Sequence, residues 1–460
     1  MGSVEDEPGD GSLLGFLGQH AESKRAYGKQ PVPQRGHSIM GGKTTMRIAF
    51  STMAAAGHLN PMTTLARKMR ERGYEIVFAG IPDAEPAVRE AGLEFYPLAE
   101  REFPRGSMRE QLRQLSRLSG LAGLRFTVQF GCRIFEAEAR DTPEVIRRTG
   151  AQAAVVDQIC AGFSVAAKRL GVPLIHIANA LPINLYGSVP PGIVGWPYRT
   201  GYFARLRNRA GNAAFRRLLG PYLTVVADYY RRYDLPFDFR DANGGLSKLA
   251  QISQVPAAFD FPNPELPPWF HHAGPFHDGQ GRAAAEFPWD RLTGEPIIYV
   301  SMGTVQNGFE HVFRTIAQGC AGLGRQLVVS IGGNLTVEGV GPLAGNCIVV
   351  GHAPQLELLR RATLCITHAG LNTALESLAA GVPMVAIPVT NDQPGVAARI
   401  AYTGTGTVVP YRRLSEDRLR RAVRRVLDDG RYRENARRLQ AAIQTANGLE
   451  RAADIIEGTL

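Results

Sequence analysis

The chain has 460 residues and a formal net charge of +10, with 44% apolar and 20% charged residues. This composition is typical of a globular protein and excludes a disordered one, and the length predicts two domains rather than one. No apolar stretch reaches the roughly 20 residues that a membrane-spanning helix needs. The positive net charge is compatible with binding to nucleic acid, to an anionic membrane surface or to a phosphate-bearing substrate. It is also compatible with helix faces that are simply solvated. The sequence contains no helix-turn-helix, zinc-finger or aromatic-basic RNA-binding pattern, so no nucleic-acid partner is expected.

The cysteines and the N-terminal residues indicate the cellular compartment. An odd number of single cysteines without paired spacing argues against a disulfide framework or a zinc site, and predicts reduced thiols in the cytoplasm. Residues 1–45 have no apolar period and no basic-then-apolar signal, so we expect a flexible N-terminal extension there. The five cysteines are Cys132, Cys160, Cys320, Cys347 and Cys365.

The expected folded part begins with a short buried strand at 47–51. A glycine turn at 54–58, a helix at 61–72 and a strand at 75–79 follow. Strand, turn, helix and strand in this order are typical of a right-handed parallel unit. The alternation returns downstream, where we expect strands at 153–156 and 173–177, a helix at 162–170 and a basic amphipathic helix at 199–219.

A tract rich in proline and aromatic residues, 255–276, is expected to mark the seam between two domains, because such composition breaks regular elements. Further strands are expected at 296–301, 326–331, 347–350, 364–367 and 384–387. The sequence therefore predicts an α/β protein of two Rossmann-like, doubly wound halves that face a cleft. The predicted parts are a first domain (46–265), a linker (266–285), a second domain (286–445) and a C-terminal helix (446–460) that crosses back to the first domain.

The most informative stretch follows the strand expected at 364–367. It places His368, Gly370, Asn372 and Thr373 at a helix N-terminus, where backbone amides and the helix dipole bind phosphate. One turn into the helix, the carboxylate of Glu376 can reach ribose hydroxyls. After a further strand, Asp392 and Gln393 offer an acceptor and an amide to a polyhydroxyl ligand. Each residue alone also fits an ordinary capped helix.

A second constellation follows the first strand. His58 stands in the stretch Gly-His-Leu-Asn-Pro, and an imidazole there can take a proton from a hydroxyl. Asp157 comes directly after the strand at 153–156 and can orient this imidazole. A structural histidine and a helix-capping aspartate are the alternatives.

The stretch from His368 to Asp392 resembles the donor-binding signature of the UDP-dependent glycosyltransferases, in which His-x-Gly-x-Asn-(Ser/Thr)-x-x-Glu leads through Gly-Val-Pro to Asp-Gln. The spacing matches without a gap. The resemblance implies the GT-B fold and a metal-independent inverting transfer without a cofactor, with UDP-glucose as co-substrate. It also implies that the domain at 46–265 binds the acceptor and the domain at 286–445 the nucleotide sugar. His58 would be the base and Asp157 its partner. The donor pyrophosphate would contact His368 and Thr373, its ribose Glu376, and its sugar Asp392 and Gln393.

Four further positions are assigned by the same resemblance. His352 and Ala353 stand where the family stacks and bonds the uracil, Gln355 matches the glutamine beside it, and Thr304 matches a phosphate-binding hydroxyl. Plant members have Trp at the positions of His352 and Leu371, so this chain departs from the family at the nucleobase.

Within the family, the strings Ala-Gln-Ile-Ser-Gln (250–254) and Asp-Gln-Pro-Gly-Val-Ala (392–397) resemble the bacterial zeaxanthin glucosyltransferases. That likeness implies a lipophilic acceptor, a carotenoid diol, with macrolides, flavonoids and sterols as alternatives. The basic amphipathic stretches at 105–125 and 199–219 suit a peripheral contact with the inner face of a membrane, or are solvated faces. Two alternatives belong to other functional classes: a UDP-sugar epimerase and an inactive, binding-only paralogue.

Overall fold

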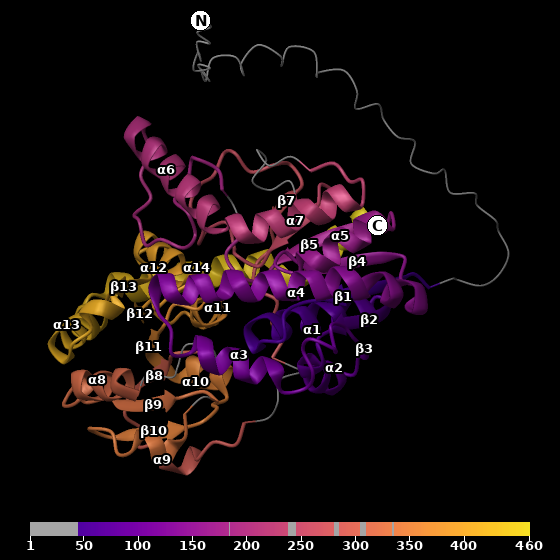
Figure 1. The fold of residues 1–460 in the computed structure, drawn as a ribbon. Helices are drawn as coiled ribbons and strands as arrows, with labels where there is room; N and C mark the ends of the chain where they lie inside the picture. Colours follow the sequence, from indigo (N-terminus) through magenta and orange to yellow (C-terminus); the bar gives the residue numbers. More distant parts are fainter. Residues whose placement is uncertain (1–44, 184, 238–244, 280–284, 304–309, 334) are drawn as a thin grey trace, which may run out of the picture. The chain divides into compact units, whose positions relative to one another are not determined.

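The computed structural model describes residues 45–183, 185–237, 245–279, 285–303, 310–333 and 335–460. The stretch Thr45–Leu460 forms one compact unit. The extension predicted at 1–45 lies, up to residue 44, outside the described residues. Figure 1 shows the elements in chain order.

The first sheet has seven parallel strands in the order β3-β2-β1-β4-β5-β6-β7. Its central strands are apolar and buried on both faces, as expected for a parallel sheet covered by helices. The strands are β1 (Arg47–Ser51), β2 (Glu75–Gly80), β3 (Glu94–Pro97), β4 (Ala153–Asp157), β5 (Leu174–Ala178), β6 (Ala250–Ser253) and β7 (Phe270–His272). The helices of this part are α1 (Ala56–Glu71), α2 (Glu85–Glu90), α3 (Ser107–Leu115), α4 (Gly120–Thr149), α5 (Ala161–Arg169), α6 (Tyr202–Leu218) and α7 (Gly220–Arg232), with a 3-10 turn η1 (Pro82–Ala84).

The second sheet has six parallel strands in the order β10-β9-β8-β11-β12-β13. Its strands are β8 (Ile297–Ser301), β9 (Gln326–Ser330), β10 (Cys347–Val350), β11 (Ala362–Thr367), β12 (Met384–Ala386) and β13 (Gly406–Val408). The helices are α8 (Glu310–Cys320), α9 (Val337–Val340), α10 (Gln355–Arg361), α11 (Leu371–Ala379), α12 (Gln393–Tyr402), α13 (Glu416–Asp428), α14 (Gly430–Ala446) and α15 (Gly448–Thr459), with 3-10 turns η2 (Trp289–Arg291) and η3 (Tyr411–Arg413).

The predicted doubly wound halves are confirmed, because each sheet is parallel and each strand order reverses once. Every strand that the sequence predicted is present within two residues of its expected ends. Three strands, β3, β6 and β13, were not expected, and a fourth, β7, lies inside the proline-rich tract that was expected to lack regular elements. Within the described residues, no helix is both long and apolar enough to cross a bilayer.

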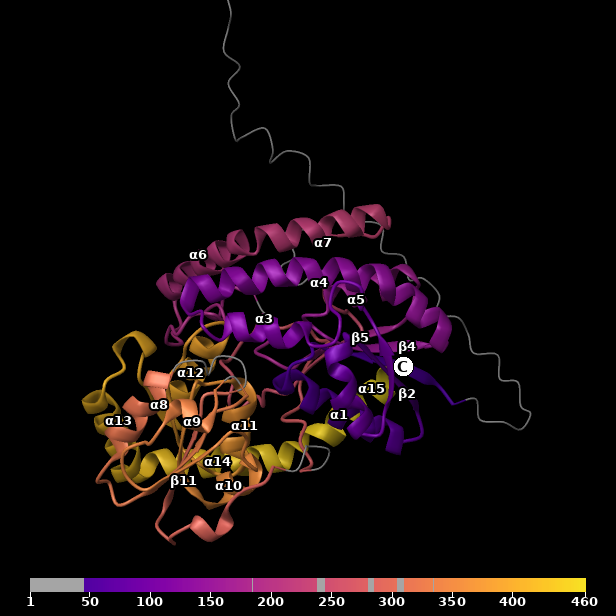
Figure 2. The same cartoon turned by 60° about the horizontal axis from the view of Figure 1, so that its bottom comes forward.

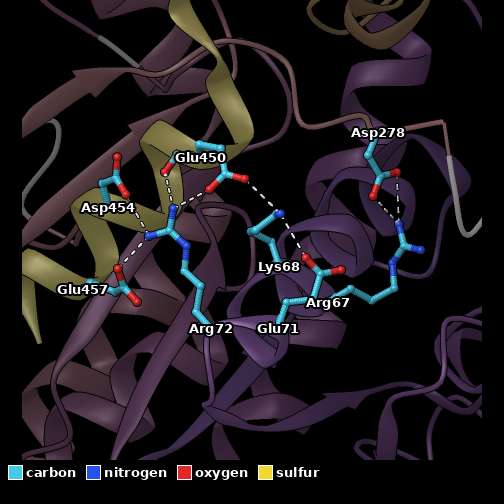
Figure 3. Close-up of polar contacts among 8 residues, drawn as sticks. All are labelled: Arg67, Lys68, Glu71, Arg72, Asp278, Glu450, Asp454 and Glu457. Atoms are coloured by element: carbon cyan, nitrogen blue, oxygen red, sulfur yellow. Dashed lines mark hydrogen bonds and ion pairs between the residues drawn. The ribbon is translucent and has the colours of Figure 1, made fainter.

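The last helix, α15, packs on the first half of the chain (Figure 2). Four of its apolar residues belong to the core cluster that contains β1 and α1: Leu449, Ala452, Ala453 and Ile456. Around this contact, Arg72 at the end of α1 pairs with Glu450, Asp454 and Glu457 at 2.5–2.7 Å, and Lys68 pairs with Glu450 at 2.9 Å (Figure 3). Such exposed pairs add little stability each, so the apolar contact carries most of the attachment. The domain boundaries stay predictions; β7 falls within 266–285 and α15 within 446–460.

Candidate active site

The two strand orders place the candidate residues together. In the first sheet the order reverses between β1 and β4, and in the second between β8 and β11. The chain leaves such neighbouring strands in opposite directions, which opens a crevice at their carboxyl ends. A cavity of about 300 Å³ is lined by residues that follow these strands in both halves.

His58 and Asp157 meet at the carboxyl ends of β1 and β4. The Nδ1 atom of His58 lies 2.7 Å from Oδ2 of Asp157. The same carboxylate oxygen accepts hydrogen bonds from Thr52 Oγ1 at 2.7 Å and from Asn179 Nδ2 at 2.8 Å. Asp157 is fully buried, while His58 lines the cavity. The aspartate therefore lies behind the histidine and fixes its ring.

The pKa values of this pair move apart. Burial lowers the pKa of His58, but the charge and hydrogen bond of Asp157, with a smaller contribution from Asp392, outweigh it and raise that pKa above 6.5. Burial raises the pKa of Asp157, but His58, Asn179 and Thr52 outweigh it and hold that pKa below 3.8. An ionised carboxylate only accepts, so Nδ1 carries the proton and Nε2 is the basic nitrogen.

His58 lies in a helix rather than in a turn, which corrects the prediction for 54–58. Helix α1 begins at Ala56 and includes Pro61. Proline has no N–H, so it cannot bond the carbonyl four residues earlier, which is that of Gly57. The side-chain amide of Asn372, on α11, donates to that carbonyl. The missing helical bond is thus replaced by a contact from the opposite half of the chain.

Asn372 closes a ring of hydrogen bonds around the His58 pair. Its Oδ1 accepts from Gln254 Nε2 at 2.9 Å, and the same nitrogen lies 2.7 Å from the carbonyl of Asn179. Asn179 in turn donates to Asp157. Both ends of the Asn372 side-chain amide therefore contact protein.

His368 is held between two glycines. A Cβ atom at Gly303 or at Gly370 would lie 2.4 Å from an atom of the imidazole ring. Burial lowers the pKa of His368 to about 4, although a hydrogen bond that its ring donates to the backbone carbonyl of Ser301 raises it. Ala369, next to His368, has a positive φ of 64°, a conformation that costs energy for a residue with a Cβ. The loop after β11 therefore packs closely against an imidazole that is neutral at pH 7.

Glu376 on α11 is the end of a short polar chain. Its Oε2 accepts from Gln355 Nε2 at 2.5 Å, and Gln355 Oε1 accepts from Tyr299 at 3.0 Å. Both Gln355 and Glu376 line the cavity. Gln355 therefore orients the carboxylate in addition to any contact with a ligand.

Asp392 and Gln393 follow β12. Asp392 Oδ2 accepts from the N–H of Leu181 at 3.2 Å, and burial raises the pKa of Asp392 despite this bond and the nearby charge of His58. Gln393 Oε1 accepts from the N–H groups of Val389 and Thr390 at 2.8 and 3.1 Å. The side-chain oxygen of Gln393 is therefore bound within the protein.

The structure brings nine of the predicted site residues into the cavity wall: His58, Gln355, His368, Gly370, Asn372, Thr373, Glu376, Asp392 and Gln393. Asp157 lies directly behind His58. His352 and Ala353 are not among the residues that line this cavity; His352 is exposed beside Gly333. Thr304 lies outside the described residues.

The apolar part of the cavity wall was not predicted. Helices α3 and α4 contribute Met108, Leu112, Leu115, Phe126 and Phe130 to it. These residues belong to the stretch 105–125 and its continuation, in which the sequence showed arginines on one face and apolar residues on the other. That amphipathic pattern was the available signal, because an apolar face away from the core can line a ligand site.

Polar groups around the base were missed as well. Gln254 and Asn179 are buried and line the cavity, and Asn179 Oδ1 has no hydrogen-bond partner among the described residues. A substrate hydroxyl can pair with such an oxygen. In the described part of the chain, no group of three His, Cys, Asp or Glu side chains could hold a metal ion.

Comparison with known proteins gives the family. Residues 248–454 match the model of the family described as UDP-glucoronosyl and UDP-glucosyl transferase. A zeaxanthin glucosyltransferase of Pseudescherichia vulneris is 31% identical over 409 residues, which cover 87% of this chain and 94% of the relative. The zeaxanthin glucosyltransferase of Pantoea ananas is 29% identical over 402 residues, covering 87% and 93%.

The fold has solved counterparts. The calicheamicin glycosyltransferase superposes with a TM-score of 0.68 at 23% identity, covering 90% of this chain and 98% of that one. The two parallel sheets therefore form the GT-B architecture that the sequence predicted. From these matches, the chain belongs to the UDP-glucuronosyl and UDP-glucosyl transferase family and is a glycosyltransferase that uses a nucleotide-sugar donor.

Proposed function

We propose that the protein transfers glucose from UDP-glucose to a hydroxyl of a lipophilic acceptor, a carotenoid diol of the zeaxanthin type, with inversion at the anomeric carbon. The observation that carries this proposal is the His58–Asp157 pair in the wall of the cavity that also contains the N-terminus of α11. A base and an anion-binding helix end in one cavity are what a transfer from a sugar diphosphate needs.

His58 would act through Nε2. Asp157 holds the proton on Nδ1, so Nε2 can take the proton of the acceptor hydroxyl. The acceptor oxygen then forms a bond to the anomeric carbon from the side opposite the diphosphate, and the bond between that carbon and the phosphate oxygen breaks. The nucleoside diphosphate leaves with the electron pair, and the imidazolium remains beside Asp157.

The donor would lie along α11. The backbone amides of its first turn, the hydroxyl of Thr373 and the ring of His368 would contact the diphosphate; Thr373 and His368 line the cavity. A His368 pKa of about 4 makes this imidazole neutral at pH 7, so it would contribute to the diphosphate site without a full charge. The helix dipole supplies the electrostatic part without a metal.

The remaining donor contacts follow from the same placement. Glu376 would bind ribose hydroxyls, and Asp392 and Gln393 would bind glucose hydroxyls. The uracil would reach His352, Ala353 and Gln355, and Thr304 would add a phosphate contact. No metal and no other cofactor takes part in this proposal, and the reaction takes place in the cytoplasm.

The acceptor proposal rests on the apolar wall of α3 and α4 and on the two zeaxanthin glucosyltransferase relatives. A long apolar alcohol would contact Leu112, Phe126 and Phe130 while its hydroxyl reaches His58. Macrolides, flavonoids and sterols share this chemistry and belong in the same acceptor panel.

The test is UDP release from UDP-glucose with a panel of lipophilic alcohols that includes zeaxanthin, with the product's anomeric configuration read by NMR. Release is expected only with an acceptor, and the glycoside is expected as the β-anomer. His58→Ala is expected to lower kcat by roughly 10²- to 10⁴-fold. His311→Ala, at an exposed histidine on α8, is the matched control and should retain activity.

Three outcomes would contradict the proposal. Full turnover by His58→Ala would remove the base from the mechanism. UDP release without any acceptor would indicate a hydrolase or an epimerase. An α-glycoside product would exclude inversion.

A further inference from the structure

Helix α6 carries its large apolar side chains on the outside. Tyr202, Phe203 and Leu206 are 75%, 82% and 53% exposed. Nine large apolar residues are exposed in the described part of the chain. Three of them, including the two most exposed, lie between positions 202 and 206. In Figure 1 the end of α6 remote from α7 extends beyond the neighbouring ribbons. A cluster of this kind on a surface indicates an interaction site.

The buried face of the same helix is polar. Asn208 is fully buried and Asn212 is 4% exposed. Asn212 donates to the carbonyl of Tyr186 at 2.8 Å, and the Arg207 side chain bonds Asn208 and lies over the Trp196 ring. A helix that only covers a core has the opposite arrangement, with apolar residues inside and polar residues outside. The outward position of the aromatic residues is therefore built into the sequence.

The charge of α6 restricts its partner. The helix contains five arginines and no acidic residue between Tyr202 and Leu218. In a symmetric contact with a second copy, these arginines would face each other and repel. An anionic partner is complementary to them. Tyr and Phe beside arginines are also the composition of helices that lie in the headgroup region of a bilayer.

We propose that α6 is a docking surface for an anionic lipid bilayer. Tyr202, Phe203 and Leu206 enter the headgroup region, and the arginines contact lipid phosphates. The surface lies outside the cavity wall, so it adds a partner to the enzyme and does not take part in the chemistry. Attachment there would hold the enzyme where a lipophilic acceptor is dissolved.

The experiment is sedimentation of the full chain with vesicles of 70% phosphatidylcholine and 30% phosphatidylglycerol, and with vesicles of phosphatidylcholine alone. Binding to the anionic vesicles is expected to be at least tenfold stronger and to weaken in 0.5 M salt. The double variant Tyr202→Ser, Phe203→Ser should lose at least tenfold in the partition coefficient. The variant Arg205→Gln, Arg217→Gln should bind both kinds of vesicle about equally.

A matched double variant, Leu170→Ser, Leu249→Ser, removes two exposed apolar residues away from α6 and should bind like the original chain. Thermal unfolding followed by circular dichroism checks that each variant is folded. Equal sedimentation with and without the anionic lipid would overturn the proposal. A dimer in light scattering that Tyr202→Ser, Phe203→Ser dissociates, without vesicle binding by the original chain, would overturn it in favour of self-association. The readout is independent of His58 and of turnover, so its outcome is separate from that of the proposed reaction.

Discussion

His58 and His368 line one cavity from the two halves of the chain, and their environments move their pKa values in opposite directions. Each follows a strand at the point where its sheet reverses order. Burial lowers both pKa values, but His58 has the carboxylate of Asp157 at 2.7 Å, whereas His368 is surrounded by backbone and glycine. In the proposed reaction, one residue type would therefore supply a base on the acceptor side and a neutral imidazole on the diphosphate side. The partner, and not the burial, decides between these roles.

The largest effect is expected from removing that partner. Asp157→Asn leaves the shape but takes away the charge, and its amide can donate to Nδ1, which puts the proton on Nε2. We expect kcat to fall by roughly 10²- to 10⁴-fold. Asn179→Ala, which removes an uncharged hydrogen bond to the same oxygen, is the control and should cost about tenfold. Steady-state kinetics measures both, and equal losses in the two variants would show that the charge is not what matters.

The next effect tests whether Asn372 joins the two halves or binds the donor. Asn372→Ala removes the bond to the Gly57 carbonyl and the contact with Gln254. We expect kcat to fall by roughly 10- to 100-fold, because helix α1, which contains His58, loses its hydrogen bond to α11. Calorimetry should give a nearly unchanged affinity for UDP, and Gln254→Ala should change kcat in the same direction. A large loss of UDP affinity with unchanged kcat would instead make the Asn372 side chain a phosphate ligand.

A smaller effect is expected on the side of His368. Gly370→Ala puts a Cβ atom 2.4 Å from Nε2 of His368, so the ring must move from the diphosphate position. We expect the affinity for UDP to fall about tenfold while the pH midpoint of kcat/KM stays the same. Gly220→Ala is the control, because a Cβ atom there would meet no other atom within 4 Å. Unchanged UDP affinity in Gly370→Ala would remove His368 from the diphosphate site.

The smallest effect is the pH dependence itself. His58 acts as a base only when neutral, and its pKa is raised above 6.5, so kcat/KM should rise with pH through a midpoint above 6.5. One pH unit below the midpoint, kcat/KM should be about tenfold lower than its plateau at high pH. Asp392→Asn should move the midpoint slightly to lower pH, because the Asp392 charge raises the His58 pKa. A midpoint below 6.5 would contradict a His58 base paired with Asp157.

The strands and the site motifs could be predicted from the sequence because local patterns determine them. The apolar runs around β1, β4, β8 and β11 gave the central strands, and the residues after them gave the histidines. The short strands β3, β6 and β13 were missed, since three or four residues carry too little pattern. The helical position of His58 was missed because a proline was taken as the helix start.

Contacts between residues that are far apart in the sequence could not be predicted from the spacing of the motifs. Asn372 looks like a phosphate-binding residue in the sequence, and its bond to Gly57 spans 315 positions. Gln254 stood in a recognised string, but no local pattern connects it to Asn372 or Asn179. The inverted orientation of α6 was hidden as well, since the sequence shows only that one face is apolar and not which face is buried.

Helix α15 has a consequence for the order in which the protein can fold. Arg72 of α1 and Glu450 of α15 contact each other across 378 positions, and the apolar residues of α15 complete the core around β1. Synthesis proceeds from the N-terminus, so the first sheet must wait for nearly the whole remaining chain before its core is closed. During that time the faces of β1 and α1 that α15 will cover are open to solvent and to chaperones. Slow, assisted folding during translation is the expected behaviour of this chain.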